Sequence, residues 1–365
     1  MDLDFSPAER DFRAEVRDWL RTHVPGPLPS MDTPEGFAAH RAWEAELAGA
    51  RLSVVSWPEE YGGRGASLIE WLIFEEEYWA AGAPARVTQN GIFLLAPSLM
   101  RFGTAEQRER WLPRMARGDD VWAQAWSEPE AGSDLAALTS RAEPVPGGWR
   151  LSGHKTWSSR AAHATHGFGL FRTSGTRHKG LTYFLFPLSE VGVRPIAQLD
   201  GLPGFAELHF DGVYVPESMV LGQAGEGWRI AMATTSSERG LTLRSPGRFL
   251  ATADRLVALA RDAADPALAD RAARCWVEAE AYRLHTFGTA RRIMAGDEIG
   301  SAASMGKIFW SELDLRMHAL ALELLGDRAQ EWLDGFLFSL AGPIYAGTNE
   351  IQRNIVAERV LGLPR

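Results

Sequence analysis

The chain has 365 residues, and 38 Lys and Arg against 47 Asp and Glu give it a formal net charge of −9 at pH 7. This balance argues against a general binder of nucleic acid or of anionic membranes, which needs a basic face. Hydrophobic residues at 45% and charged residues at 23% are ordinary for a packed protein. The length allows two or three domains.

The single cysteine, Cys275, excludes an intrachain disulfide framework and a cysteine-rich metal site. It lies in a helical pattern beside Trp276, and we interpret it as a small core residue rather than a nucleophile. No window approaches the ~20 apolar residues that span a bilayer. The acidic start Met-Asp-Leu-Asp-Phe resembles neither a secretory signal nor a transit peptide. We therefore expect a cytoplasmic protein without membrane insertion.

The first third of the chain has helical patterns. Ser6-Pro7-Ala8-Glu9 combines an N-cap serine, a proline at the first helical position and the glutamate of a capping box. Thr104-Ala105-Glu106-Gln107 is a second capping box. Between them the pattern predicts helices over 37–48, 67–81 and 91–102, the last kinked at Pro97, and a turn over 57–63.

From about residue 121 the pattern changes to strands. Short segments rich in β-branched and aromatic residues are separated by Gly, Pro, Ser or Asp, which predicts a compact antiparallel sandwich or barrel. These segments are 121–126, 149–151, 167–172, 181–187, 193–196 and 208–215.

The remainder of the chain is helical again. The predicted helices are 226–244, 248–263, 267–294, 301–326, 328–339 and 348–360. Pro246 interrupts the first of them, because proline lacks a backbone donor. The sequence therefore predicts an α+β protein with an N-terminal helical domain (1–119), a middle antiparallel β domain (120–224) and a C-terminal helical bundle (225–365).

Common signatures of catalysis and metal binding are absent. Residues 62–65 do not complete a dinucleotide-binding fingerprint and follow no strand. His163 and His166 are close in sequence, but no carboxylate or cysteine cluster accompanies them, so a solvated loop is favoured over a metal site. We expect no metal ligand set.

Three segments could carry chemistry. Residues 126–134 leave a strand and present Gly132 and Ser133 in a turn, where a backbone can approach an anion or a carbonyl. Residues 155–159 place Trp157 beside hydroxyl groups, which suits stacking on a flat ring. Residues 343–351 end in a helix start with Thr348 as the N-cap. On composition alone a surface loop is favoured for the first segment. A half-buried tryptophan explains the second equally well, and a simple helix cap is the alternative for the third.

Together, in this order and spacing, these segments resemble the acyl-CoA dehydrogenase family, from about residue 3 to residue 365. Residues 57–63 and the Gly225-Glu226-Gly227-Trp228 stretch add to the resemblance. The family's fold has a helical, a β and a second helical domain, usually in tetramers, with FAD between the middle domain and the C-terminal bundle. The resemblance is to the group with its catalytic glutamate on the first long helix of the C-terminal domain, such as the catalytic subunit of bacterial heteromeric enzymes.

The resemblance implies α,β-dehydrogenation of an acyl-CoA: a carboxylate removes the α-proton while the β-hydrogen leaves as hydride to flavin N5. The expected cofactor-binding residues are Gln124, Trp126, Ser127, Gly132, Ser133, Trp157, Ser159, Thr348 and Glu350. Ser133 and Arg239 are expected near the bound thioester. The backbone N–H of Ala346 is expected to donate to the thioester oxygen.

The catalytic base is the main departure from the family's pattern. Many members carry a glutamate where this chain has Ala346, whose methyl group cannot take a proton. In the second group the base precedes an arginine, and Glu238 before Arg239 matches that site. We expect Glu238 to be the general base, with its pKa raised by apolar walls. The alternative is a surface glutamate in an ion pair within its helix.

The far end of the FAD site also departs from the family. An Arg-Phe-Gly stretch is missing from 245–269, and residues 323–327 read Glu-Leu-Leu-Gly-Asp where relatives have Gln-Gly-Gly. We expect a homologous second subunit to supply this half in an α2β2 assembly; a homo-oligomer with altered adenine contacts is the alternative. The family implies an electron-transfer flavoprotein as acceptor. Ala346 and Gly240 are small enough to be compatible with a branched, cyclic or bulky acyl group.

Two other functions remain open. The chain could be a non-catalytic partner subunit of a heteromeric acyl-CoA dehydrogenase, although the flavin-binding loops and Glu238 argue against it. It could also be a flavin enzyme of this fold that acts on a substrate without CoA.

Overall fold

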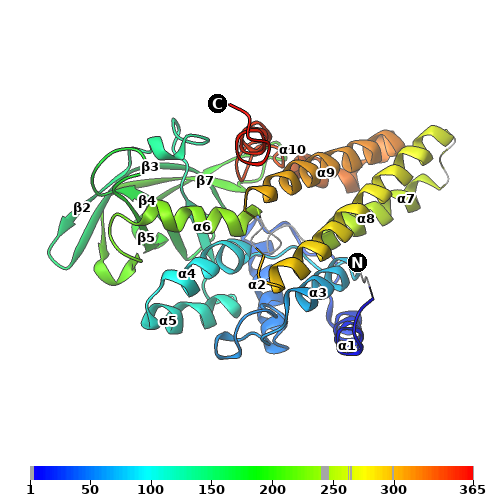
Figure 1. The fold of residues 1–365 in the computed structure, drawn as a ribbon, viewed down its shortest axis with the longest axis horizontal. Helices are drawn as coiled ribbons and strands as arrows, with labels where there is room; N and C mark the ends of the chain where they lie inside the picture. The colour runs from blue at the N-terminus through cyan, green and yellow to red at the C-terminus, as the bar shows by residue number, and fades with distance from the viewer. Residues whose placement is uncertain (1–3, 240–245, 262, 264, 298–299, 365) are drawn as a thin grey trace. The chain divides into compact units, whose positions relative to one another are not determined.

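The computed structural model describes residues 4–239, 246–261, 263, 265–297 and 300–364. Over these residues the predicted order of helices, sheet and helices is confirmed (Figure 1). By contact the chain divides into two compact units that interleave in sequence. One consists of 1–25, 66–83 and 239–365, and the other of 26–65 and 84–238. The division into three consecutive domains stays a prediction.

The first unit is helical. Its helices are α1 (Pro7–His23), α3 (Leu68–Ala80), α7 (Pro246–Ala260), α8 (Pro266–Met294), α9 (Ala303–Leu325), α10 (Gln330–Leu340) and α11 (Asn349–Ile355). Figure 1 shows α7, α8 and α9 as long helices side by side. The predicted capping box forms at α1, where Ser6 and Glu9 cap each other's backbone N–H groups.

The core of this unit lies between α7, α8 and α9. Phe249, Trp310, Leu313 and Met317 are fully or almost fully buried there. Cys275 belongs to the same cluster, and burial raises the pKa of its thiol. Its interpretation as a core residue is therefore confirmed.

The helix α3 packs against α7 and α8, and α1 packs against α3, although both precede α7 by more than 160 residues. Glu76 of α3 pairs with Arg13 of α1 and with Arg283 of α8. The α7 backbone approaches α3 so closely at Gly247 that an added Cβ would lie 2.6 Å from the Glu75 carbonyl oxygen. Only glycine allows this approach, which explains why Gly follows Pro246 at the start of α7.

The second unit combines a sheet with shorter helices. The helices are α2 (Pro34–Gly49), α4 (Ala96–Phe102), α5 (Ala105–Ala116) and α6 (Gly227–Arg239). The strands are β1 (Trp122–Ala125), β2 (Arg141–Val145), β3 (Gly148–Ser159), β4 (His166–Arg172), β5 (Leu181–Pro187), β6 (Gly192–Ile196), β7 (Phe205–Pro216) and β8 (Val220–Leu221).

The sheet has the strand order β6-β7-β3-β2-β4-β5-β8, with β1 paired to β4. Most pairs are antiparallel, as expected, but β1 and β2 both run parallel to β4. Aromatic side chains of β4 and β5 fill the core: Phe168, Phe171, Phe184 and Phe186 are completely buried. No described helix has the length and apolar character that a membrane crossing requires.

Candidate functional site

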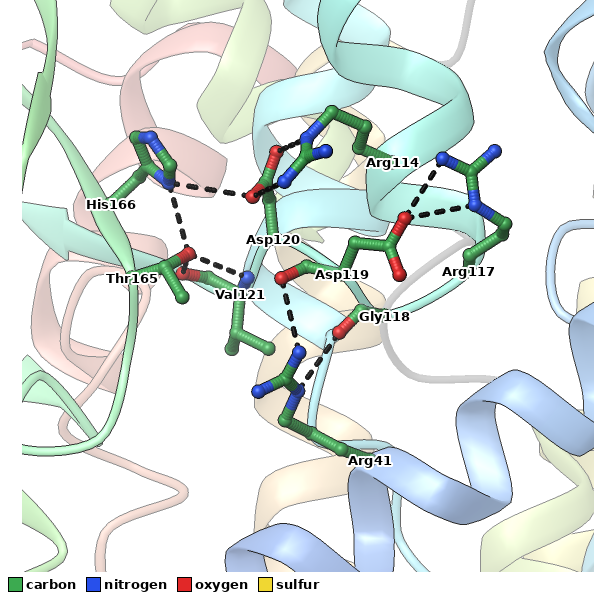
Figure 2. Close-up of polar contacts among 9 residues, drawn as sticks. All are labelled: Arg41, Arg114, Arg117, Gly118, Asp119, Asp120, Val121, Thr165 and His166. Atoms are coloured by element: carbon green, nitrogen blue, oxygen red, sulfur yellow. Dashed lines mark hydrogen bonds and ion pairs between the residues drawn. The ribbon is translucent and has the colours of Figure 1, made fainter.

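Two helices of the second unit bind residues 118–120, the segment that leads into β1 (Figure 2). Arg41 of α2 donates to the carbonyl oxygens of Gly118 and Asp119 at 3.0 and 3.1 Å. Arg114 of α5 binds both carboxylate oxygens of Asp120. These contacts fix the backbone that leads into Gln124 and the candidate loop after it.

His166 of β4 packs against the start of β1. Its ring stacks on Trp122 at a centroid distance of 4.8 Å and meets Trp111 edge-on at 5.0 Å. Burial lowers the pKa of His166, and the carboxylate of Asp120 opposes this effect. The expectation of a solvated loop was wrong for His166, because the aromatic neighbours that bury it are distant in sequence.

The candidate loop after β1 is tied to β3. The backbone N–H of Thr156 donates to the carbonyl oxygen of Ser127 at 2.9 Å, and Lys155 Nζ donates to the carbonyl oxygen of Trp126 at 3.3 Å. The segments around residues 126–128 and 155–157 therefore lie side by side. Gly132 and Ser133 are exposed in the same loop.

A buried ion pair lies beneath this junction. Lys155, with no exposed surface, donates to Glu128 Oε1 at 2.8 Å. Burial lowers the pKa of Lys155 to about 8, although Glu128 opposes the shift. Burial alone would raise the pKa of Glu128, but Lys155 and hydrogen bonds from Ser140 and Thr139 lower it to about 2. The pair joins the two motif segments and was not predicted from the sequence.

Trp157 has an unusual backbone conformation. Its φ is +61°, in the left-handed region that bulky residues rarely adopt. The β3–β7 register shifts between Lys155 and Ser158, so Trp157 lies in an irregularity of the strand pair. Its side chain is 60% exposed and touches Phe205 edge-on. A large aromatic held exposed in a strained conformation is typical of a binding surface.

Two polar side-chain atoms of these segments are buried without a partner. Trp126 Nε1 and Ser158 Oγ are shielded from solvent and have no hydrogen-bond partner among the described residues. Buried donors are almost always satisfied, so atoms of this kind call for a partner. Gln124, Ser127 and Ser159 are partly exposed in the same region. The expected flavin-binding residues of this unit thus lie on neighbouring segments around one exposed tryptophan.

The first unit holds the other expected residues in the turn before α11. Ala346 and Gly347 both have positive φ, +57° and +79°. Thr348 caps α11, as predicted, by accepting from the Ile351 N–H at 3.2 Å. Glu350 is exposed in the first turn, where hydrogen bonds from its own backbone and from Thr348 lower its pKa.

Two buried side chains shape this turn. Gln352 Nε2 donates to the carbonyl oxygens of Ala346 and Gly347 at 3.0 and 3.2 Å. Lys307 of α9, with no exposed surface, donates to Asn349 Oδ1 at 2.8 Å. No local pattern pointed to Lys307, because its partner is 42 residues away in sequence.

The expected base and its neighbour are only partly described. Glu238 and Arg239 are the last two residues of α6, and their side chains lie outside the described part of the structure. Upstream in α6, Thr234 is completely buried and shares a 2.6 Å hydrogen bond with Ser98 of α4. The role of Glu238 stays a prediction.

The Glu-Leu-Leu-Gly-Asp stretch at 323–327 lies at the end of α9. Glu323 pairs with Arg271 of α8 at 2.8 Å, and both side chains are about half exposed. Gly326 starts a short turn with φ +53°, followed by Asp327. The pairing offsets part of the negative charge of Glu323.

Comparisons with known proteins cover almost the whole chain. Residues 6–119, 123–213 and 225–361 match the models of the N-terminal, middle and C-terminal domains of acyl-CoA dehydrogenase. The chain is 40% identical over 380 residues to acyl-CoA dehydrogenase IpdE1 of Mycobacterium tuberculosis, covering 97% of this chain and 98% of the relative.

Two solved structures have the same fold over the full length of both chains. One is described as the Tcur3481-Tcur3483 steroid ACAD, with a TM-score of 0.87 and 26% identity. The other is the ChsE4-ChsE5 complex from Mycobacterium tuberculosis, with a TM-score of 0.84 and 27% identity. Each covers 100% of this chain and is itself covered to 100%.

Proposed function

The chain belongs to the acyl-CoA dehydrogenase family, and on that premise we propose that it dehydrogenates an acyl-CoA thioester with Glu238 as the general base. Family membership makes it an oxidoreductase with FAD as cofactor. The observation that carries the proposal is the exposed Trp157 with positive φ, beside the partly exposed hydroxyl residues Ser127 and Ser159. This arrangement fits the flat, polar-edged ring of a flavin.

The bound FAD supplies a hydride acceptor for the β-hydrogen of the substrate. The chain's own residues would hold it: Trp157 would stack, Ser159 would offer a donor to its polar edge, and Gln124, Trp126 and Ser127 would line it. Gly132 and Ser133 leave room for phosphate groups at an exposed loop. Thr348 and Glu350 contribute from the start of α11.

Proton removal falls to Glu238. The α-proton of a thioester is too weakly acidic for a free carboxylate, so the thioester oxygen has to be stabilised as negative charge develops. A donor aimed at such an oxygen is typically worth about 3 kcal/mol. We assign one such donor to the backbone N–H of Ala346, and this role does not depend on the side chain. Ser133 and Arg239 complete the contacts to the thioester substrate.

The substrate that we propose is a bulky acyl-CoA. The solved structure with 26% identity is described as a steroid ACAD, and Ala346 leaves more space than the glutamate found there in many family members. A polycyclic acyl group suits this space. Electrons leave, in this proposal, to an electron-transfer flavoprotein.

Glu238→Gln tests the proposal. It keeps the size of the side chain and removes its basicity, so we expect kcat to fall by at least about a thousandfold, within the range for loss of a general base, while FAD stays bound. The measurement is anaerobic bleaching of the flavin by a panel of acyl-CoAs, with steroid-derived and linear acyl groups. Glu190→Gln, at an exposed position, is the matched control and should bleach like the wild type.

The outcome also separates the alternatives. Wild-type protein that stays colourless with its partner would favour a non-catalytic subunit. Bound flavin that no acyl-CoA bleaches would favour a substrate without CoA. An active Glu238→Gln variant would contradict the assigned base.

A further inference from the structure

The outer face of the β3–β7 pair carries two histidines and a glutamate together. His154 and His209 are direct cross-strand partners. Glu207 precedes His209 by two residues and therefore points to the same side of the sheet. Leu208 and Phe210, which alternate with them, are buried on the other side. The strand pairing brings residues that are more than 50 positions apart in sequence onto one face.

The distances within this group match a ligand set. Glu207 Oε2 lies 3.7 Å from His154 Nε2 and 3.4 Å from His209 Nε2. One ligand atom of each residue lies within 4.8 Å of the others. A tetrahedral zinc ion with bonds of about 2.05 Å has ligand atoms about 3.3 Å apart. Two of the three separations are thus close to those of a zinc site. The imidazole rings lie stacked at 4.3 Å with an interplanar angle of 21°, so one ring has to turn for both Nε2 lone pairs to point at the same ion.

The same atoms do not satisfy one another by hydrogen bonding. His154 Nε2 is shielded from solvent and has no hydrogen-bond partner among the described residues. Its 3.7 Å separation from Glu207 exceeds the range of a hydrogen bond. Two imidazoles and one carboxylate suit zinc and cobalt, whereas magnesium and calcium prefer oxygen ligands.

We propose that His154, Glu207 and His209 bind a zinc-class divalent cation, with the fourth position open to solvent. A bound cation would fasten β3 to β7 close to the irregularity that holds Trp157. This site is separate from the proposed catalytic residues, so its test does not depend on the proposed function.

One nearby positive charge, that of Arg194, opposes cation binding. Arg194 of β6 is the cross-strand partner of Glu207, and its guanidinium lies 4.0 Å from the same carboxylate oxygen. The Arg194 side chain is 78% exposed, so it can move away at little cost. Removing its charge by Arg194→Gln should tighten metal binding.

The experiment titrates the FAD-loaded protein, first treated with EDTA, with Co²⁺ and then with Zn²⁺. We expect one equivalent of Co²⁺ to give the visible absorption of a four- or five-coordinate ion, and Zn²⁺ to displace it. His154→Gln and His209→Gln should each weaken binding by at least about tenfold, because each removes one of three ligands. Arg194→Gln should strengthen it. Circular dichroism establishes that each variant is folded.

His178→Gln is the matched control, since His178 is an exposed histidine outside the strands, in the same unit. Its variant should bind Co²⁺ like the wild type. Thermal melts give a second measurement: Zn²⁺ should raise the Tm of the wild type and not that of His154→Gln. The proposal would be overturned if both histidine variants bound Co²⁺ as tightly as the wild type. It would also be overturned if the wild type bound no Co²⁺ when the metal is present at about 100 times the protein concentration.

Discussion

Trp157 shows how one residue can be kept in a costly conformation. A positive φ costs a residue with a Cβ roughly 1–2 kcal/mol, and the exposed indole recovers little of this through burial. The surrounding strands hold the conformation through the pairing that resumes at Ser158. The proposed gain is a rigid flat surface for the flavin.

The first prediction concerns this strain. Trp157→Gly should leave the free energy of unfolding in urea unchanged or raise it by about 1 kcal/mol, because glycine adopts positive φ without cost. The same variant should lose FAD faster during dialysis. Tyr214→Gly is the matched control: Tyr214 is a half-exposed aromatic in the regular part of β7. It should destabilise the protein and leave FAD retention unchanged.

The second prediction concerns the buried Lys155–Glu128 pair. Removing one partner leaves an uncompensated buried charge, which costs about 3–5 kcal/mol. Lys155→Met should therefore be much less stable than the wild type, and Lys155→Met with Glu128→Gln should recover a large part of the loss. Urea unfolding of both single variants and of the double variant measures the coupling. Strictly additive losses would contradict it.

The stability that the Lys155–Glu128 pair contributes depends on pH in a direction that can be predicted. The pKa of Glu128 falls from 4.5 to about 2 on folding, so the stabilisation is complete above pH 4.5 and is lost as the pH falls towards 2. Glu128→Gln should flatten the stability profile in that window.

At the scale of elements, the turn before α11 depends on a charge that comes from α9. Lys307 has no exposed surface and donates to Asn349, which follows the cap residue Thr348. Because α9 and α11 belong to the same unit, this bond holds the Ala346–Gly347 backbone in place through its neighbour. Lys307 is a positioning residue in the proposed mechanism.

The third prediction follows from this arrangement. Lys307→Met removes a charged donor, and such bonds contribute about 1.5–3 kcal/mol. We expect weaker FAD retention and a lower kcat with an unchanged optimum pH. Arg316→Met, which removes a half-exposed cation from the same helix, should affect neither. Equal effects of both substitutions would argue against a positioning role.

The elements differ in how far the sequence could predict them. Caps were reliable: α1 and α5 begin directly after the predicted N-cap residues Ser6 and Thr104. β2 was missed because Arg141–Val145 contains charged residues and a proline instead of an apolar alternation. Only parts of β3 were predicted, since Gly153 and polar residues interrupt its pattern. Pairing of β3 with β7 makes it one strand of 12 residues.

The candidate site divides in the same way. Motif residues such as Trp157 and Thr348 could be selected because their local spacing is distinctive. The contacts that hold them could not, because Lys155 meets Glu128 across 27 residues and the ion pair is invisible to any local pattern. The same is true of His154 with Glu207.

At the scale of the whole molecule, the acidic stretch at 323–327 supports an assembly of two different subunits. Both solved relatives with 26–27% identity are described by two-component names, Tcur3481-Tcur3483 and ChsE4-ChsE5. We propose that a homologous chain supplies the adenine half of the FAD site. Such an assembly would separate cofactor retention from catalysis.

The fourth prediction tests this assembly. Co-expression with a neighbouring homologue should give a complex of two 40.2 kDa chains and two chains of the homologue, with full FAD content. The chain expressed alone should contain less FAD. Light scattering and the flavin absorbance per chain measure both quantities. Full flavin loading and activity of the chain alone would exclude an obligate partner.

The interleaving of the two compact units has a consequence for biosynthesis. The helix α3 packs against α7 and α8, and α8 ends at Met294. Translation of the more than 200 residues between the end of α3 and the end of α8 takes about 10–40 seconds. During that time α3 emerges from the ribosome without its final neighbours. The apolar residues of this helix are therefore exposed during synthesis. A chaperone that covers short apolar segments would raise the yield of folded protein.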